Sequence, residues 1–156
     1  MNIKRKLATA ILLTIGYAGI ASAHDMPVDE LSAVNGPSAT DIWESSCSGV
    51  TGVDSFRMAA RIQDFIPGRN DKISLVVYKD GLAATTTDMN PGTGLKSDWI
   101  YVNGGNGPYT FIVHHVRAAG TALADDVYYN IEMHCEGADL ATHTGTTIPS
   151  LPVQDQ

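Results

Sequence analysis

Short runs in which apolar and polar side chains alternate recur along the chain, and clusters of Gly, Asn and Asp separate them. Alternation with a period of two is typical of a strand with one buried face, and such clusters are typical of turns. The pattern predicts about seven strands and no sustained helix, over residues 40–47, 53–64, 72–79, 82–87, 99–102, 109–117 and 126–136. We therefore expect an all-β fold, a single antiparallel β-sandwich of about seven or eight strands, jelly-roll-like or immunoglobulin-like.

The first 23 residues have the layout of a secretory signal peptide. A basic start is followed by an apolar stretch from Leu7 to Ile20, and Ala21-Ser22-Ala23 then forms a small-x-small cleavage signal. The apolar stretch is shorter than the roughly 20 residues of a membrane-spanning helix, and no stop-transfer segment or lipidation cysteine follows it. We predict a protein secreted to the extracellular space or periplasm, with no transmembrane segment and with His24 at its mature N-terminus. A membrane anchor is the alternative.

Removal of the signal makes the chain strongly acidic. The signal holds three of the ten Lys and Arg residues and none of the seventeen Asp and Glu residues, which leaves seven basic against seventeen acidic side chains and a net charge of −10. Such a chain repels phosphates, so we predict no nucleic-acid partner. The charge suits cations, basic partners or simple solubility.

The chain has two cysteines, Cys47 and Cys135. In an exported protein a single pair predicts a disulfide, here between the first and last predicted strands. Cys135 shares the apolar face of its strand, so its sulfur is expected in the core. The closed loop of about ninety residues corresponds to roughly 4–5 kcal/mol of stabilisation in the chain-entropy model.

These features divide the chain into a signal peptide (1–23), a flexible N-terminal tail (24–39), a β-sandwich domain (40–137) and an extended C-terminal tail (138–156). Both tails contain prolines and show little periodicity. An edge strand can accept an extended segment from a neighbouring chain. We therefore predict a secreted, non-enzymatic structural or binding module, in its sharpest form a filament or matrix subunit that assembles with itself or with another extracellular protein through its tails.

Several segments resemble the bacterial pre-peptidase C-terminal domain. Thr40-Asp41-Ile42-Trp43 is similar to the opening of that family, and Ile73–Gly81 resembles its strand followed by an Asp-Gly hairpin. Asn106–Val113 and Val127–Ile131 are similar to its late Gly-x-Tyr strand and its final strand. The resemblance covers residues 40–136 and implies a compact, secreted, jelly-roll-like module that is usually a non-catalytic part of hydrolases. The chain departs from the family in having no attached protease and in carrying the Cys47–Cys135 pair, which favours a stand-alone module.

The sequence contains no nucleophile elbow, phosphate-binding loop or His-Glu-x-x-His motif, so we predict no enzyme and no catalytic residue. His114 and His115 point to opposite faces of one strand. If residues 109–117 and 126–136 form a hairpin, His134 lies about 20 Å from His114 at 3.3 Å per residue. On that pairing these histidines form no metal site.

His24 is different, because cleavage after Ala23 would give it a free amine. An amine and an imidazole can chelate copper(II) together, and His143 in the other tail is the candidate for a second imidazole. An exported copper-binding protein built on His24 and His143 is therefore the alternative hypothesis. If His24 binds no metal, it is simply the first residue of a flexible terminus.

The loop Asp88-x-Asn90-x-Gly92-x-Gly94, followed by Asp98, sets oxygen ligands at alternate positions. Hard cations prefer carboxylate and amide oxygens of this kind. Asp88, Asn90 and Asp98 are therefore candidate calcium ligands. An ordinary β-turn is the alternative, and the sequence indicates no other cofactor.

Overall fold

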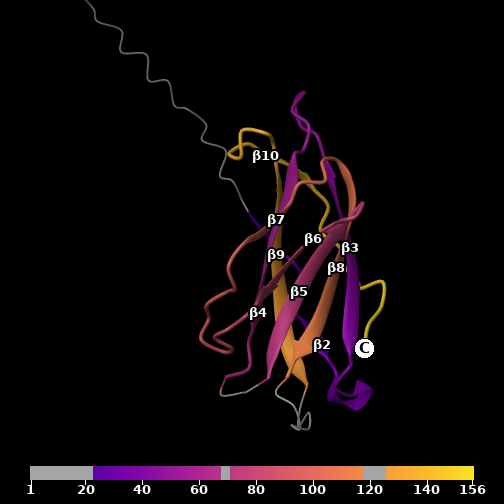
Figure 1. Ribbon diagram of the computed structural model, residues 1–156, viewed down its shortest axis with the longest axis vertical. Coiled ribbons are helices and arrows are strands. Elements are labelled where there is room, and N and C mark those ends of the chain that lie inside the picture. The colour runs from indigo at the N-terminus through magenta and orange to yellow at the C-terminus, as the bar shows by residue number, and fades with distance from the viewer. Residues whose placement is uncertain (1–22, 68–70, 118–125) are drawn as a thin grey trace, which may run out of the picture.

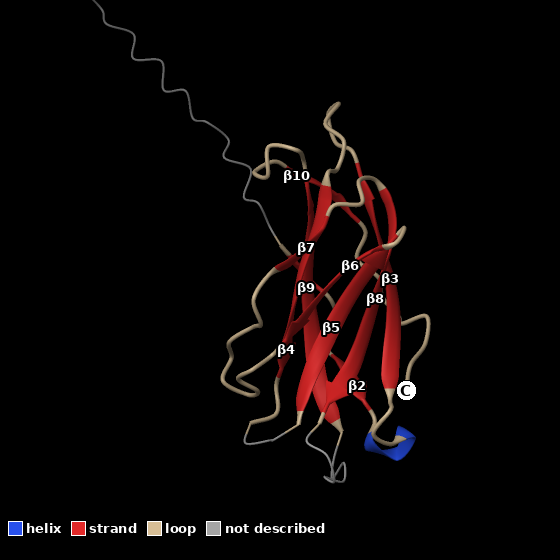
Figure 2. Cartoon of the chain, in the orientation of Figure 1, coloured by secondary structure: helices blue, strands red, loops and turns tan. Residues whose placement is uncertain are grey.

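The computed structural model describes residues 23–67, 71–117 and 126–156, which form an all-β, antiparallel structure (Figures 1 and 2). The described part contains ten strands and one turn of 3-10 helix, Ala33–Asn35. The strands are β1 (His24–Asp25), β2 (Asp29–Leu31), β3 (Thr40–Ser48), β4 (Arg57–Asp64), β5 (Lys72–Lys79), β6 (Leu82–Thr87), β7 (Ile100–Val102), β8 (Gly107–Val116), β9 (Val127–Glu136) and β10 (His143–Thr146). The predicted β-sandwich is confirmed.

Eight strands follow one another by hydrogen bonding in the order β6-β5-β8-β3-β10-β9-β4-β7, while β1 and β2 pair with β9. Strand β10 joins the two layers, because it pairs with β3 at one end and with β9 at the other. Figure 1 shows β3, β5 and β8 on one side of the molecule and β4, β7 and β9 on the other. Apolar side chains of both layers fill the space between them, including Trp43, Tyr109, Phe111, Ile62 and Ile131.

The disulfide staples the two layers together. Cys47 in β3 and Cys135 in β9 are bonded, with 5.7 Å between their Cα atoms, and both side chains are buried in the core cluster. The pairing predicted from the sequence is therefore confirmed. Since β1, β2 and β10 lie outside residues 40–136, the bond joins the first and last strands of the predicted domain and not of the whole fold.

The turn between β5 and β6 also follows from the sequence. Lys79 pairs with Leu82 across the two-residue connection Asp80-Gly81. Both residues have positive φ angles, 49° and 83°. This is the conformation of a tight hairpin turn, which an Asp-Gly pair adopts readily.

The predicted hairpin of residues 109–117 and 126–136 is wrong. Strand β8 pairs with β3 and β5, whereas β9 pairs with β4, so the two strands lie in different layers. Alternation shows which face of a strand is buried but does not select its neighbour, and the expected turn at Gly120-Thr121 lies outside the described residues. The spatial argument against a histidine site therefore no longer holds.

The N-terminal tail, predicted to be flexible, is part of the sandwich. Strands β1 and β2 pair with β9, and Met26 and Leu31 are buried in the core. These apolar anchors explain the difference from the expectation. The C-terminal tail is extended, but it too is docked, because Val153 and Gln154 exchange backbone hydrogen bonds with Ile42.

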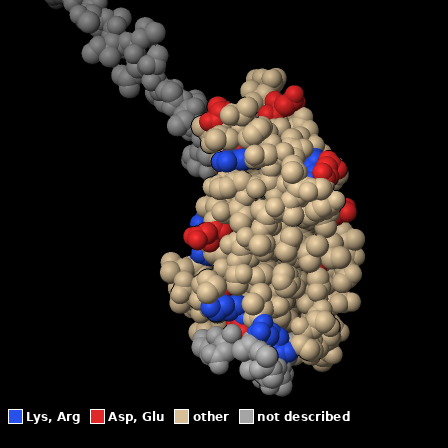
Figure 3. Space-filling model, viewed as in Figure 1, with Lys and Arg blue, Asp and Glu red and all other residues tan. Residues whose placement is uncertain are grey.

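The described residues include no helix that is long and apolar enough to cross a membrane, and the predicted signal peptide lies before them except for Ala23. Figure 3 shows acidic and basic side chains scattered over one face of the molecule, with a broad uncharged area between them. The acidic surplus is thus not gathered into one patch on this face.

Candidate metal centre

The outer face of β9 carries a row of polar side chains. Met133 and Cys135 point into the core, so Glu132, His134 and Glu136 point the other way. Ala59 of β4 stands opposite His134. Because the side chain of Ala59 is short, larger side chains from neighbouring segments can pack beside the imidazole of His134.

Cations neutralise both carboxylates in this row. Arg57 pairs with Glu136, and Arg61 and Lys96 pair with Glu132. The guanidinium of Arg61 also lies 4.4 Å from the centroid of the Trp99 ring. Pairing of this kind is what allows charged groups to be buried on a sheet face.

Strand β10 brings a second histidine to this row. His143 stands opposite Glu136 in the register of β10 and β9. The turn between the strands is closed by the hydrogen bond from Gly137 N to Thr142 O, at 2.8 Å. Asp139 organises it, because its carboxylate accepts hydrogen bonds from the backbone of Ala141 and Thr142 and from the Thr142 hydroxyl.

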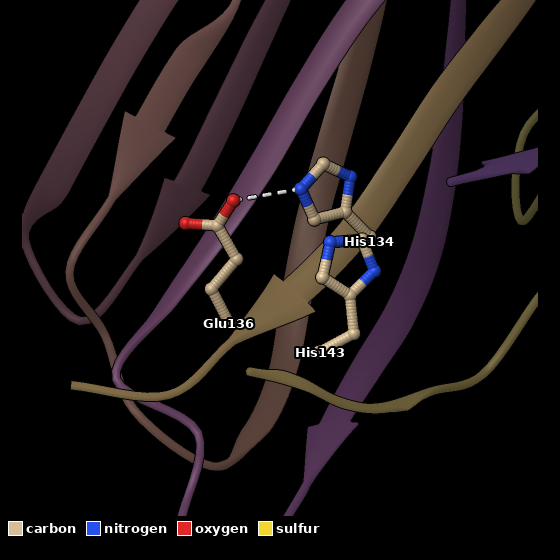
Figure 4. Close-up of side chains that lie close together, drawn as sticks. All are labelled: His134, Glu136 and His143. Atoms are coloured by element: carbon tan, nitrogen blue, oxygen red, sulfur yellow. Dashed lines mark hydrogen bonds and ion pairs between the residues drawn. The ribbon is translucent and has the colours of Figure 1, made fainter. Parts of the chain in front are cut away.

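His134, Glu136 and His143 form a compact cluster, which we call the β9–β10 site (Figure 4). One ligand atom from each residue lies within 4.8 Å of the others. His134 Nε2 is 2.8 Å from Glu136 Oε1, and the two imidazoles stack with centroids 4.3 Å apart and planes inclined by 7°. Trp99 closes one side, with its ring edge-on to His134 at 4.9 Å.

Burial and neighbouring charges set the ionisation of two groups in the β9–β10 site. Burial tends to raise the pKa of Glu136, but hydrogen bonds from His134 and Arg57 and their charges bring it below its usual value. Burial lowers the pKa of His143, and the charge on His134 lowers it further while Glu136 opposes the shift. An ionised carboxylate and a neutral imidazole are the forms that bind metal ions.

One nitrogen of the site lacks a partner. His134 Nδ1 is buried and has no hydrogen-bond partner among the described residues. A buried, unsatisfied polar atom of this kind calls for a ligand, an ion or a water molecule.

Two imidazoles and one carboxylate suit zinc, copper, iron or nickel, not calcium. Metal–nitrogen bonds of about 2.0–2.1 Å place two ligand atoms no more than about 4.2 Å apart. The separations in the site, up to 4.8 Å, and the stacking of the two rings therefore require the side chains to move closer and the rings to rotate before they bind one ion. His143 is only partly buried, so the site has an open side for entry.

His24 and His143, the copper candidates, lie on the same edge of β9. Strand β1 places His24 opposite Met133, whose side chain points into the core, so the exposed side chain of His24 lies on the other face of β9 from His134 and His143. The sequence analysis missed His134 and Glu136 as ligands. Their i, i+2 spacing on an outward face was the available signal, and the wrong hairpin pairing hid it.

The calcium candidates lie elsewhere, in the loop after β6. Asp88 is buried, and its two carboxylate oxygens accept hydrogen bonds from the backbone of Asp64 and Asn90, each at 2.8 Å. Asn90 and Asp98 are exposed. Asp88 thus has a structural role in the loop, and calcium binding there stays a prediction.

No protein-family profile matches the chain, and no curated protein matches its sequence. Among solved structures, a family two carbohydrate esterase from Cellvibrio japonicus is similar at 12% identity with a TM-score of 0.30, over 84% of this chain and 38% of that one. The chain thus spans well under half of that structure. A similarity of this size carries no argument about fold or activity, and the resemblance to pre-peptidase C-terminal domains stays a prediction.

Proposed function

We propose that this protein is an exported, non-enzymatic β-sandwich that binds a transition-metal ion at the β9–β10 site. The observation that carries the proposal is the convergence of His134, Glu136 and His143 within 4.8 Å on a largely buried face. Export rests on the predicted signal peptide and agrees with the disulfide, which is typical of oxidising compartments.

The rigidity of the site supports a binding role. Cys135 lies between His134 and Glu136 in β9, and its bond to Cys47 ties this part of the strand to the opposite layer. Strand β10, which carries His143, is held by β9 and β3 together. Ligands fixed on anchored strands lose little conformational freedom on binding, which favours affinity.

Titration of the protein with Zn(II) and with Cu(II) tests the proposal. An ion that binds only the native state increases the free energy of unfolding, by about 2.7 kcal/mol when its concentration is a hundred times the dissociation constant. The melting temperature therefore rises. We expect His143→Ala to abolish this effect and His114→Ala to preserve it. His114 is the matched control, since it lies on β8 in the other layer. Equal metal responses in both variants, or no response in the wild type, would refute the proposal.

Assembly through the tails is a second proposal. It is supported by the way β1 and β2 add to the edge of β9 as short strands, because a segment that completes its own sheet can also complete that of a neighbour. Deletion of residues 24–31 tests it: added peptide of that sequence should restore stability, and concentrated wild-type protein should form exchanged oligomers. A strictly monomeric wild type would exclude this role.

A further inference from the structure

We infer that the β9–β10 site takes up a small carboxylate from solution together with the metal ion, and that Arg57 binds this anion beside the ion. The inference rests on the proposed function. It adds a second ligand of a stated chemical class and the residue that recognises it, and it makes metal affinity depend on the anions around the protein.

The three residues of the site supply three ligand atoms. Each imidazole gives one nitrogen. Glu136 gives one oxygen, because its Oε2 accepts a hydrogen bond of 2.5 Å from Arg57 Nε while Oε1 lies 2.8 Å from His134 Nε2. No fourth His, Cys, Asp or Glu among the described residues joins the cluster. Because zinc(II) takes four ligands and tetragonal copper(II) at least four, one coordination position is left for a ligand from solution.

The charges on the outer face of β9 balance before an ion binds. Its ion pairs join three cations to three carboxylates: Arg57, Arg61 and Lys96 to Glu136, Glu132 and Asp25. The carboxylate of Asp139, in the turn to β10, is exposed and is held by hydrogen bonds within that turn.

A divalent ion brings two positive charges that these pairs do not neutralise. His134 and Glu136 are each only 7% exposed, so the added charge lies on a largely buried face. Uncompensated charge is costly to hold away from water. The open coordination position therefore favours an anion over a water molecule.

Arg57 has donors available for such an anion. Its Nε binds Glu136, and its guanidinium carbon lies 3.8 Å from the centroid of the Tyr101 ring. Its two terminal nitrogens have no hydrogen-bond partner within the part of the chain that the structure describes. The side chain is 17% exposed, so solutes reach it. The planar fork of a guanidinium matches the oxygens of a carboxylate.

The strand register sets these nitrogens beside the site. Arg57 stands opposite Glu136, and two residues further along β4 Ala59 stands between Tyr101 of β7 and His134 of β9. Since the guanidinium contacts both Glu136 and Tyr101, it reaches over Ala59, next to His134. Glu136 itself bridges Arg57 and His134 with its two oxygens, so a carboxylate is the group that matches this spacing.

The experiment measures the copper(II) affinity of the protein at increasing acetate concentration, with the ionic strength held constant by perchlorate. Acetate that binds only the metal-loaded protein raises the apparent copper(II) affinity by mass action. Acetate also binds free copper(II), and comparison of variants in the same solutions removes that contribution.

Arg61→Gln is the matched control, because Arg61 also pairs with a glutamate of β9 and stacks on an aromatic ring, but its partner Glu132 lies outside the cluster. We expect the acetate concentration at half effect to be equal in the wild type and in Arg61→Gln. It should be about tenfold higher in Arg57→Gln, which loses a hydrogen bond between charged groups.

Arg57→Lys keeps a cation beside Glu136 but not the planar fork, and it is the second variant if Arg57→Gln does not fold. It should bind copper(II) like the wild type without acetate and show the weakened acetate response. If acetate has no effect on the wild type, or the same effect on every variant, the inference is overturned and the proposed function stands. If the wild type binds neither copper(II) nor zinc(II), both are overturned.

Discussion

His134 and His143 stack face to face, with ring centroids 4.3 Å apart, although they lie on different strands. The stack exists because the turn formed by residues 137–142 sends β10 back along β9 and sets His143 opposite Glu136. Together the two strands supply two imidazoles and a carboxylate, a set of ligands that neither strand has alone, but both rings must tilt out of the stack to bind one ion in their planes.

Trp99 should report metal binding. Its ring lies 4.9 Å from that of His134, whereas Trp43 is buried in the core and donates a hydrogen bond to Tyr129. Copper(II) quenches nearby indole emission, so titration with Cu(II) should quench the Trp99 contribution to the fluorescence. Trp99→Phe should lose most of this response, and Trp43→Phe should retain it. A response that survives in Trp99→Phe would place the ion away from His134.

Asp139 should control the affinity of the site without touching the ion. Hydrogen bonds from Thr142 and Ala141 lower the pKa of its carboxyl to about 2, as expected for the acceptor that orders this turn. We expect Asp139→Ala to loosen His143 and to reduce metal affinity by about tenfold, the lower end of the range for groups that orient ligands.

Asp98→Ala is the matched control for that variant, because it removes an exposed aspartate from a different loop. It should leave transition-metal affinity unchanged. Isothermal titration calorimetry of both variants checks the pair, and equal losses in the two would mean that surface charge, not the turn, sets the affinity.

The buried carboxyl of Asp41 should make stability depend on pH. Burial raises its pKa to about 6, although its oxygens accept hydrogen bonds from the Tyr129 hydroxyl and the Gln156 backbone. Its pKa in the unfolded chain is near 3.8, so the native state holds the proton more tightly. The contribution of Asp41 to the free energy of unfolding therefore rises as the pH falls from about 7 toward 4, by up to about 3 kcal/mol.

Urea unfolding of the wild type and of Asp41→Asn between pH 7 and 4.5 isolates this contribution. The ionisation of other groups also affects stability between these pH values, so the relevant quantity is the difference between the two proteins. That difference should shift in favour of the wild type as the pH falls. A difference that is constant with pH would contradict the raised pKa.

The disulfide should dominate the stability of the fold. It closes a loop with a sequence separation of 88 residues, for which the chain-entropy model gives about 4.6 kcal/mol. Replacing Cys47 and Cys135 with alanine should lower the urea midpoint accordingly. The same change should weaken metal binding, because it frees the stretch of β9 between His134 and Glu136. Two reactive thiols in the unfolded, unreduced protein would contradict the bond.

Local sequence determined much of the architecture. The alternation of residues such as Ile73, Leu75 and Val77 marked the buried faces, and Asp80-Gly81 marked the hairpin of β5 and β6. The Cys47–Cys135 bond followed from a single pair of cysteines in a chain with a predicted signal peptide. The buried faces and the hairpin depend on the chemistry of residues that are close in sequence. The disulfide could be predicted because each cysteine has one possible partner.

Tertiary structure decided which strands are neighbours, and hence the site. Alternation fixes the two faces of β8 and β9, but the edges of both strands offer similar backbone donors and acceptors to any partner. Only the packing of two complete layers places β9 beside β4, β10 and β1. His143 was visible in the sequence as a candidate, but its proximity to His134 and Glu136 depends on the pairing of β10 with β9, which no local pattern encodes.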